Sequence, residues 1–222
     1  MNKSRIIAET IEFVQYKLKN SEGGHDWFHI QRVLKNAREI AAGEDVDVFI
    51  VELGALLHDI ADYKFHNGDE SVGPQIARAF LEKKEVPEEV IRHVENIING
   101  ISFKGGNEQQ AFNSPELMVV QDADRLDALG AIGIARTFNY GGFKNRPIFD
   151  PDIKPNLNMS KEEYKNSTAP TINHFYEKLL LLKDRMNTTT GKKLAAQRHE
   201  FMEEFLHEFY KEWGLPSQKW DF

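Results

Sequence analysis

The sequence predicts an all-α fold, a helical bundle with a C-terminal helical extension. Nearly every group of apolar residues recurs at three- and four-residue intervals, which is the period of an amphipathic helix. No segment shows the alternation of apolar and polar residues that is typical of a half-buried strand. Glycine and proline separate the periodic groups, as they do where helices end. We therefore expect about eight helices.

Composition and charge restrict the classes of function. With 222 residues, of which 41% are hydrophobic and 28% charged, the chain can form one domain, residues 1–222, around a substantial core. The absence of cysteine excludes disulfides and thiolate metal sites, and the N-terminus lacks the apolar core of a secretory signal, so a cytoplasmic protein is expected. The net charge of −7 opposes binding to a nucleic-acid polymer, and no membrane partner is expected. A small phosphorylated ligand is compatible with this charge.

The first two helices are predicted by apolar stripes with clear ends. The first runs from about residue 4 to 19 and ends before Gly23. The second follows Asp26, which is expected to be its N-cap, and closes at Gly43. His29 lies on the inward face of this second helix. The apolar residues of the two stripes are Ile6, Ile7, Ile11, Val14 and Leu18, and then Ile30, Val33, Leu34, Ala37, Ile40 and Ala41.

The third helix, from about residue 47 to 60, is almost wholly apolar until it reaches His58 and Asp59. An apolar run of about ten residues is too short to span a bilayer and is typical of a helix buried in a globular core. A carboxylate in such surroundings loses several kcal/mol of hydration unless a positive group meets it. His58, Asp59 and Asp62 therefore indicate a cation, a metal ion or a phosphate-bearing ligand nearby. The polar residues 62–69 are expected to form a loop over the site.

Three more helices and an aperiodic segment follow. A fourth helix covers roughly residues 70–83, and a fifth starts at Pro87, because proline is favoured in the first helical turn. A sixth starts at Pro115, and one continuous helix is expected through its inward-facing residues, which are Val120, Asp124, Asp127, Ala131 and Ile134. Residues 139–170 show no sustained period. Segments of this length inside a compact domain are usually lids or binding elements, so substrate contacts are expected there.

Two amphipathic helices complete the chain. The apolar face of one consists of Ile172, Phe175, Leu179, Leu182 and Met186. The apolar face of the other consists of Phe201, Phe205, Phe209 and Trp213, which are expected to pack in a core or an interface.

Four candidate ligands come from three separate predicted helices: His29, the pair His58 and Asp59, and Asp124. None of them is explained by core packing, and helical proteins build metal sites from side chains on facing helices. Two imidazoles and two carboxylates without a thiolate suit Mn²⁺, Fe²⁺, Co²⁺, Ni²⁺ or Zn²⁺. Such an ion makes water easier to deprotonate and neutralises charge on a phosphoryl group, so hydrolysis of a phosphoester or phosphoanhydride is the expected reaction.

The order and local context of these residues resemble the signature of the HD-domain metal-dependent phosphohydrolases. His29 in HDWFHIQRV, His58-Asp59 in LGALLHDIADYKF and Asp124 in VVQDADRLDALGAIGIAR are similar to the H…HD…D pattern of that family. The resemblance implies that these four residues bind a divalent ion, Mn²⁺ first, with Co²⁺, Ni²⁺, Fe²⁺, Zn²⁺ or Mg²⁺ as alternatives.

The same resemblance implies an organisation of the chain. It places the metal-binding core at about residues 24–136, where the similarity is firmest. The segment HFYEKLLLLKDRMNT and the final helix look like the C-terminal half of one bacterial branch, which gives a helical lobe over about residues 137–222. That branch includes nucleotide pyrophosphohydrolases.

Asp62 and Lys64, which follow the HD pair, are expected to take part in catalysis. Asp62 matches an acidic residue that some members place beside the nucleophile, which implies a general base or a residue that orients water. Its alternative is a loop carboxylate that caps the following turn. Lys64 is a candidate phosphate contact, and its alternative is an ordinary exposed lysine.

Three further residues are candidates for substrate binding. Arg32 lies one turn beyond His29 and could hold a phosphate or pair with a surface acid such as Glu39. His93 could contact phosphate or a second metal, or simply form a hydrogen bond with a neighbour. Arg125 could neutralise substrate charge or hold Asp122. Asp127 is expected to orient a metal ligand, since metal-binding histidines generally need a hydrogen-bond acceptor for their other ring nitrogen.

The leading hypothesis is a hydrolase that releases pyrophosphate from a nucleoside or deoxynucleoside triphosphate. Its alternatives within the same chemistry are a nucleotide monophosphatase or another phosphoester hydrolase. A non-catalytic ligand sensor on the same scaffold is a hypothesis from another class, and the presence of all four candidate ligands argues against it. A purely structural helical bundle, in which arginines satisfy the buried acids, is the third.

Overall fold

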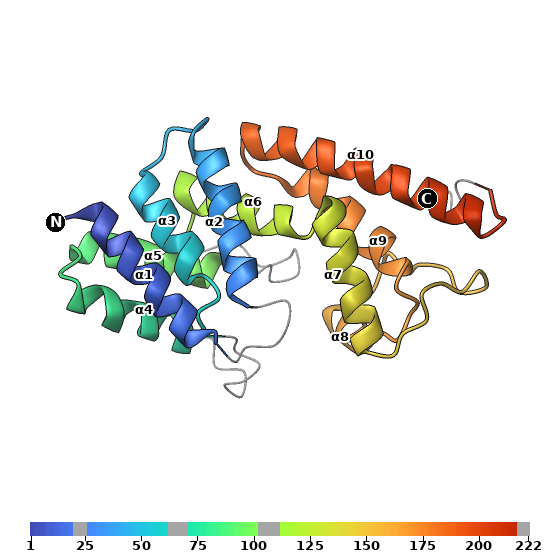
Figure 1. Cartoon of the computed structure of the whole chain (residues 1–222), viewed down its shortest axis with the longest axis horizontal. Helices are drawn as coiled ribbons and strands as arrows, with labels where there is room; N and C mark the ends of the chain where they lie inside the picture. The colour runs from blue at the N-terminus through green and yellow to red at the C-terminus, as the bar shows by residue number, and fades with distance from the viewer. Residues whose placement is uncertain (20–25, 62–70, 102–111, 217–222) are drawn as a thin grey trace. The chain divides into compact units, whose positions relative to one another are not determined.

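The computed structural model confirms the all-α fold (Figure 1). The structure describes residues 1–19, 26–61, 71–101 and 112–216, and every regular element within these ranges is a helix. The chain divides into two compact units. The first unit comprises Met1–Asp124 and Asn187–Gly191, and the second comprises Arg125–Met186 and Lys192–Phe222. Compactness does not establish independent folding, so the single-domain organisation expected from the sequence stays a prediction.

The first unit is organised around α3 (Val48–Leu57), which packs against three other helices. These are α1 (Lys3–Lys17), α2 (Trp27–Ala41) and α5 (Glu88–Ile101). Every residue of α3 from Phe49 onward is buried except Glu52, because its neighbours cover it on several sides. Glu52 accepts a hydrogen bond from Nε of Arg38 on α2 at 2.6 Å, which explains how one acid is accommodated in this helix.

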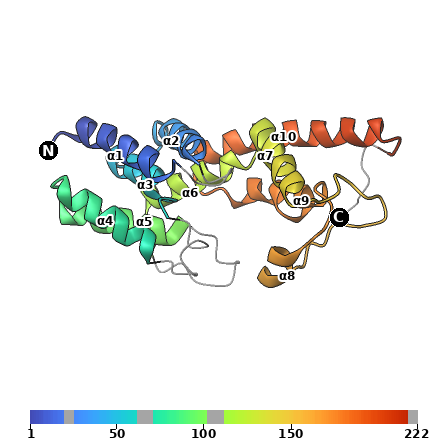
Figure 2. The ribbon, with the colours of Figure 1, turned by 60° about the horizontal axis from the view of Figure 1, so that its bottom comes forward.

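Two further helices belong to the described part of this unit. Helix α4 (Val72–Lys83) lies beside α5 in both views of the ribbon (Figures 1 and 2). Helix α6 (Pro115–Asp127) carries Asp124 near its C-terminal end. On α4, Arg78 donates hydrogen bonds to Glu88 and Glu95 of α5, and to Glu82 of its own helix. This guanidinium therefore cross-links the two helices at the surface of the unit.

Side-chain caps fix the N-terminal ends of three helices. Asp26 Oδ1 accepts a hydrogen bond from His29 N at 2.9 Å, which confirms the predicted N-cap of α2. Asp47 accepts from Phe49 N at 2.9 Å, and Asn2 accepts from Arg5 N at 3.1 Å. Each bond satisfies an amide that has no partner within its own helix.

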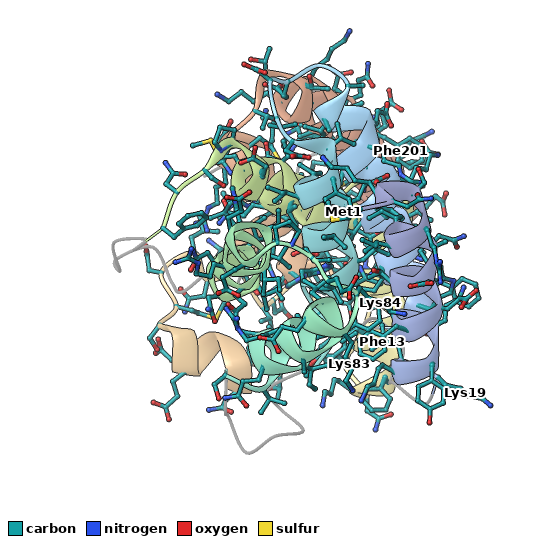
Figure 3. All side chains as sticks on the ribbon, turned by 90° about the vertical axis from the view of Figure 1, so that its left-hand side faces the viewer. Met1, Phe13, Lys19, Lys83, Lys84 and Phe201 are labelled. Carbon is teal, nitrogen blue, oxygen red and sulfur yellow. The ribbon has the colours of Figure 1, made fainter. Side chains whose placement is uncertain are left out.

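Helices α1 and α4 are joined by an aromatic and an ionic contact. The rings of Phe13 and Phe80 stack at 4.1 Å between centroids, and Lys84 Nζ lies 2.7 Å from Glu9 Oε2. Figure 3 shows Phe13 and Lys84 close together at this junction. We expect the stacked rings to contribute more than the half-buried ion pair does.

The second unit contains shorter helices around an aromatic core. Its elements are α7 (Gly130–Phe143), α8 (Lys161–Asn166), α9 (Asn173–Glu177), the 3₁₀ helix η2 (Leu179–Arg185) and most of α10 (Thr189–Glu212). Phe175 is fully buried and contacts the rings of Phe138 and Phe205. Phe149 contacts the rings of Phe209, Tyr210 and Trp213. The predicted packing of the face of Phe201, Phe205, Phe209 and Trp213 is only partly correct, because Phe201 and Trp213 are each 48% exposed. The buried residues of this stretch of α10 are Met202, Leu206 and Tyr210.

The continuous helix expected from Pro115 through Ile134 was wrong. Helix α6 ends at Asp127, and the next two amides make tight three-residue hydrogen bonds, to the carbonyls of Arg125 and Leu126. Gly130 then adopts φ +70°, a left-handed conformation that suits glycine. The period continues past this break only because α7 begins immediately after it.

The single helix expected over residues 172–186 was also wrong. Lys178 leaves the helical region (φ −144°, ψ −57°) and separates α9 from the 3₁₀ helix. A 3₁₀ helix places residues three apart on one face, so the spacing of Leu179 and Leu182, both buried, fits this helix type as well. The aperiodic segment expected to start at residue 139 begins later, because α7 continues to Phe143, and it contains α8.

In the described part of the chain, no helix is both long and apolar enough to cross a bilayer.

Candidate metal centre

Three helices of the first unit bring the predicted ligands together at their ends. His29 lies in the first turn of α2, where Asp26 caps the helix. His58 is the C-cap residue of α3 and Asp59 follows it, so the buried helix delivers both side chains as it ends. Asp124 lies one turn before the end of α6.

The distances between these side chains define a compact cluster. One ligand atom from each of His29, His58 and Asp59 lies within 4.8 Å of the other two. Asp124 Oδ1 is 3.5 Å from His29 Nε2 and 3.9 Å from His58 Nε2. The two imidazole rings are 5.4 Å apart between centroids and inclined at 71°, so their Nε2 atoms point to a common region rather than stacking.

A hydrogen bond on the side of the ring away from the cluster fixes the orientation of His58. Its Nδ1 lies 2.9 Å from the carbonyl oxygen of Ala55, one turn earlier on α3. A carbonyl oxygen only accepts, so Nδ1 carries the proton and Nε2 presents its lone pair to the cluster. A backbone carbonyl behind the imidazole is a common device for orienting metal-binding histidines.

The donor set is chemically suited to a divalent metal ion. Two imidazole nitrogens and carboxylate oxygens from two residues converge, and none of these donors is a thiolate. The side chains of His29 and His58 are only 3% and 4% exposed, so the imidazoles are shielded from water, whereas Asp124 is 38% exposed and leaves one side open. A cation at this position would offset the cost of holding carboxylates beside two largely buried imidazoles.

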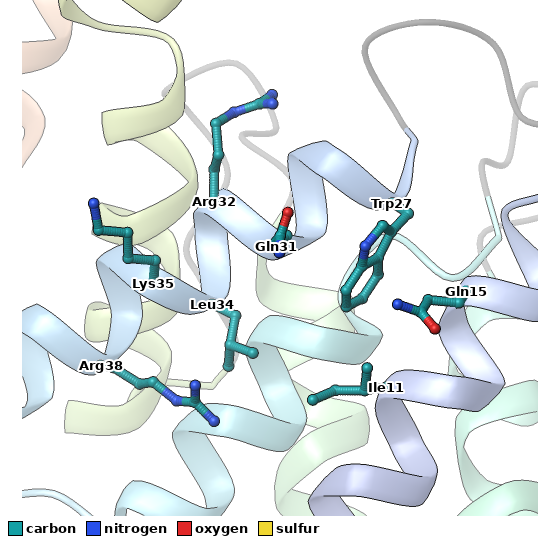
Figure 4. A pocket seen from close by; sticks show the side chains of 8 residues that line it. All are labelled: Ile11, Gln15, Trp27, Gln31, Arg32, Leu34, Lys35 and Arg38. Carbon is teal, nitrogen blue, oxygen red and sulfur yellow. The ribbon is translucent and has the colours of Figure 1, made fainter.

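The structure shows contacts or surroundings for two of the other candidate residues, Arg32 and Arg125. Arg32 and Trp27 are among the residues that line a groove of about 670 Å³ between α1 and α2, where the Arg32 side chain extends away from the indole (Figure 4). Arg125 donates to the carbonyl oxygen of Arg185 at 2.7 Å. Asp62 and Lys64 lie outside the described residues. The roles expected for all four stay predictions.

His93 is engaged at the opposite end of α6 from Asp124. Its Nε2 lies 2.9 Å from Ser114 Oγ and 3.4 Å from Glu116 Oε2. Glu116 and Asp124 are separated by eight residues of helix, roughly 12 Å along the axis. This geometry shows a histidine that holds the start of α6, and a substrate contact for His93 stays a prediction.

Asp127 is paired with an arginine of its own unit. Arg136 Nη1 donates to Asp127 Oδ2 at 2.5 Å, and this contact joins the end of α6 to α7. Asp127 is almost completely buried, so the guanidinium compensates a charge that water cannot reach. Its expected role in orienting a metal ligand stays a prediction.

Two buried polar residues beside the cluster were not anticipated. Asn36 on α2 is 4% exposed and donates to the carbonyl oxygen of Ala123 at 3.1 Å. Asp122 is fully buried and accepts hydrogen bonds from Asn187 and Thr188. A signal for Asn36 was present, since it is a polar residue inside the apolar stripe of the second helix. No such signal was present for Asp122, because its partners are distant in sequence.

Comparisons with known proteins agree with this geometry. The HD domain family model matches residues 27–129, the range that contains all four clustered residues. The crystal structure of an HD-superfamily hydrolase from Bacillus thuringiensis is similar, with a TM-score of 0.78, 45% identity, and coverage of 96% of this chain and 99% of that one.

A relative from Bacillus subtilis is the uncharacterized protein YpgQ. It is 37% identical over 209 residues, which are 92% of this chain and 93% of YpgQ. A crystal structure of YpgQ in complex with ADP superimposes with a TM-score of 0.72 and 34% identity, covering 96% of this chain and 97% of that one. The ligand arrangement, the family model and these relatives agree: the chain belongs to the HD-domain superfamily of metal-dependent phosphohydrolases.

Proposed function

We propose that the protein is a nucleotide pyrophosphohydrolase, which adds one water across the α–β phosphoanhydride bond of a nucleoside or deoxynucleoside triphosphate. The products are a nucleoside monophosphate and pyrophosphate. The observation that carries the proposal is the convergence of His29, His58, Asp59 and Asp124 in a chain of this superfamily. The complex of the relative YpgQ with ADP supports a nucleotide as the ligand.

In this proposal the four clustered residues hold a divalent ion, with Mn²⁺ as the first candidate. Co²⁺, Ni²⁺, Fe²⁺, Zn²⁺ and Mg²⁺ are compatible with the same nitrogen and oxygen donors. The ion, when bound, neutralises charge on the phosphoryl groups and makes an attacking water easier to deprotonate. His58 keeps Nε2 available to the ion because its Nδ1 is bound to the Ala55 carbonyl.

Other residues of the chain bind and orient the substrate in this proposal. Asp62 orients or deprotonates the attacking water, and Lys64 meets a phosphate oxygen. Arg32 and Arg125 provide further positive charge, and His93 provides a hydrogen-bonding group. The overall charge of −7 favours a small phosphorylated substrate over a nucleic-acid polymer, and the lack of cysteine fits a cytoplasmic location.

The proposal is tested by product analysis. The purified protein is incubated with nucleoside mono-, di- and triphosphates in the presence of Mn²⁺, Co²⁺ or Mg²⁺, and products are separated by chromatography. Equal amounts of monophosphate and pyrophosphate from a triphosphate are expected. Orthophosphate alone would instead indicate a phosphatase. Metal binding without turnover of any phosphate ester would indicate a ligand sensor.

A further inference from the structure

Asp124 is held in a different way from the histidines of the metal centre. The imidazoles are buried, and that of His58 is oriented by the Ala55 carbonyl. The Asp124 side chain is 38% exposed, and its recorded polar partners in the described part of the chain are the two imidazoles themselves. The position of its carboxylate therefore depends on the backbone of α6 rather than on a hydrogen bond to the side chain.

Asn36, on α2, holds the backbone of α6 next to Asp124 through a hydrogen bond. Its Nδ2 donates to the carbonyl oxygen of Ala123, the residue that precedes Asp124, at 3.1 Å. Asn36 is about two helical turns beyond His29 on the same helix, so one bond sets the register between the helix of His29 and the helix of Asp124. Because Asn36 is 4% exposed, water cannot replace this bond without a rearrangement of the interface.

Asp122 fixes the same turn from another direction. Its carboxylate accepts hydrogen bonds from the amides of Asn187 and Thr188, and from both of their side chains, over 2.7–3.2 Å. Gly191 packs directly against this carboxylate, since a Cβ at this position would lie 2.5 Å from Asp122 Oδ2. A buried carboxylate with this many donors is rigid, and it anchors α6 two residues before Asp124.

We propose that Asn36 and Asp122 are positioning residues of the metal centre. They act through the backbone of α6 and place the Asp124 carboxylate opposite His29 and His58. They touch neither the metal ion nor the substrate. The inference rests on the proposed metal centre and goes beyond it. It states that two buried polar residues determine the position of one partly exposed ligand, Asp124.

The test is calorimetric titration of the apoprotein with Mn²⁺ alone. The variants Asn36→Leu and Asp122→Asn keep the number and branching of the side-chain heavy atoms but remove the donor or replace an acceptor oxygen. Each is expected to raise the Kd for Mn²⁺ by about tenfold or more, as the loss of groups that orient metal ligands typically does. Titrations are made at a temperature where circular dichroism shows each variant to be folded.

The matched control is Thr10→Val, which also removes one buried hydrogen bond, from Thr10 Oγ1 to the Ile6 carbonyl at 2.7 Å. It is expected to lower the melting temperature and leave the Kd for Mn²⁺ unchanged. The same pattern in Asn36→Leu and Asp122→Asn would overturn the proposal, because it would show that these residues only stabilise the fold. If Asn36→Leu does not fold, Asn36→Ala replaces it.

The visible spectrum of the Co²⁺-loaded protein gives a second readout. A displaced Asp124 changes the ligand field, so the spectrum of Asn36→Leu is expected to differ from that of the unsubstituted protein. An unchanged spectrum would contradict the proposal. Failure of the unsubstituted protein to bind Mn²⁺ would instead contradict the assignment of the metal centre, and this inference with it. Normal metal binding without pyrophosphate release would overturn the proposed function and leave this inference intact.

Discussion

The two units bury different kinds of side chain. The first has an aliphatic core, with Val51, Leu53 and Leu56 of α3 fully buried, and its helices are regular. The second is built around aromatic rings such as Phe175 and Tyr210, and its chain includes a long irregular segment and a 3₁₀ helix. The candidate metal ligands all come from the first unit. Regular, closely packed helices hold side chains in fixed directions, which a centre made from three helix ends requires.

The largest expected effect concerns the proposed metal centre of the first unit. His58→Ala or Asp59→Ala should abolish both metal retention and hydrolysis, because removal of one ligand leaves the remaining charges without compensation. Elemental analysis of the purified variants and the chromatographic assay measure the two properties. His207→Ala, which changes an exposed histidine of α10, is the matched control and should retain both. Metal content and activity that persist in the two site variants would show that the site is misplaced.

The second prediction concerns the aromatic core of the second unit. Phe175→Ala should lower the free energy of unfolding by about 3–5 kcal/mol, since it leaves a cavity among Phe138 and Phe205. Urea unfolding measures the change. Phe201→Ala, at a position that is 48% exposed, should change the same quantity by less than about 0.5 kcal/mol. Equal effects of the two substitutions would show that the unit lacks the tight aromatic core described above.

The third prediction compares two adjacent glycines of α7. A Cβ on Gly141 would overlap the Thr171 side chain, so Gly141→Ala should destabilise the protein by about 1–3 kcal/mol. A Cβ on Gly142 has nothing within 4 Å, so Gly142→Ala should stabilise the helix by about 0.5–1 kcal/mol. Thermal unfolding of both variants measures the difference in sign. The same sign for both would contradict the packing of α7 against Thr171.

The fourth prediction concerns pH. Burial, together with the positive charges of Lys178 and Arg146, lowers the pKa of His174 to about 3. The folded state therefore binds this proton less well than the unfolded state, so stability is lost as pH falls below the unfolded pKa of about 6.5. The loss should reach at most about 2 kcal/mol at pH 5, from a limiting slope of about 1.4 kcal/mol per pH unit.

His174→Gln removes this titrating group and serves as the comparison. Urea unfolding at pH 7 and at pH 5 should show a smaller loss of stability for the variant than for the unsubstituted protein. Parallel losses would mean that His174 is not neutral in the fold.

The sequence predicted the first unit well because its helices are regular. The helical period located α1 to α5, and polar residues at the ends of apolar stripes, such as His58 and Asp59, pointed directly to the cluster. The period failed where it continued across a break, as at Gly130, and where a spacing of three fitted two helix types, as at Leu179 and Leu182. The position of a helix break and the type of helix depend on the local backbone conformation, which the pattern of apolar side chains does not determine.

The contacts around the cluster were harder to predict than the cluster itself. Asp122 meets Asn187 and Thr188 across more than sixty residues of chain, and no local pattern links them. Asn36 stood out only as a polar residue on an inward face. Hydrogen bonds between distant segments are products of the tertiary fold, so they become visible only when the helices have been placed.

The most direct test of the account is anomalous diffraction at the manganese absorption edge from crystals grown with Mn²⁺. The account predicts one strong peak in the anomalous map, within bonding distance of His29 Nε2, His58 Nε2 and the carboxylates of Asp59 and Asp124. A peak elsewhere, or none in protein that is shown by titration to bind Mn²⁺, would contradict the assignment of these four residues as the metal centre.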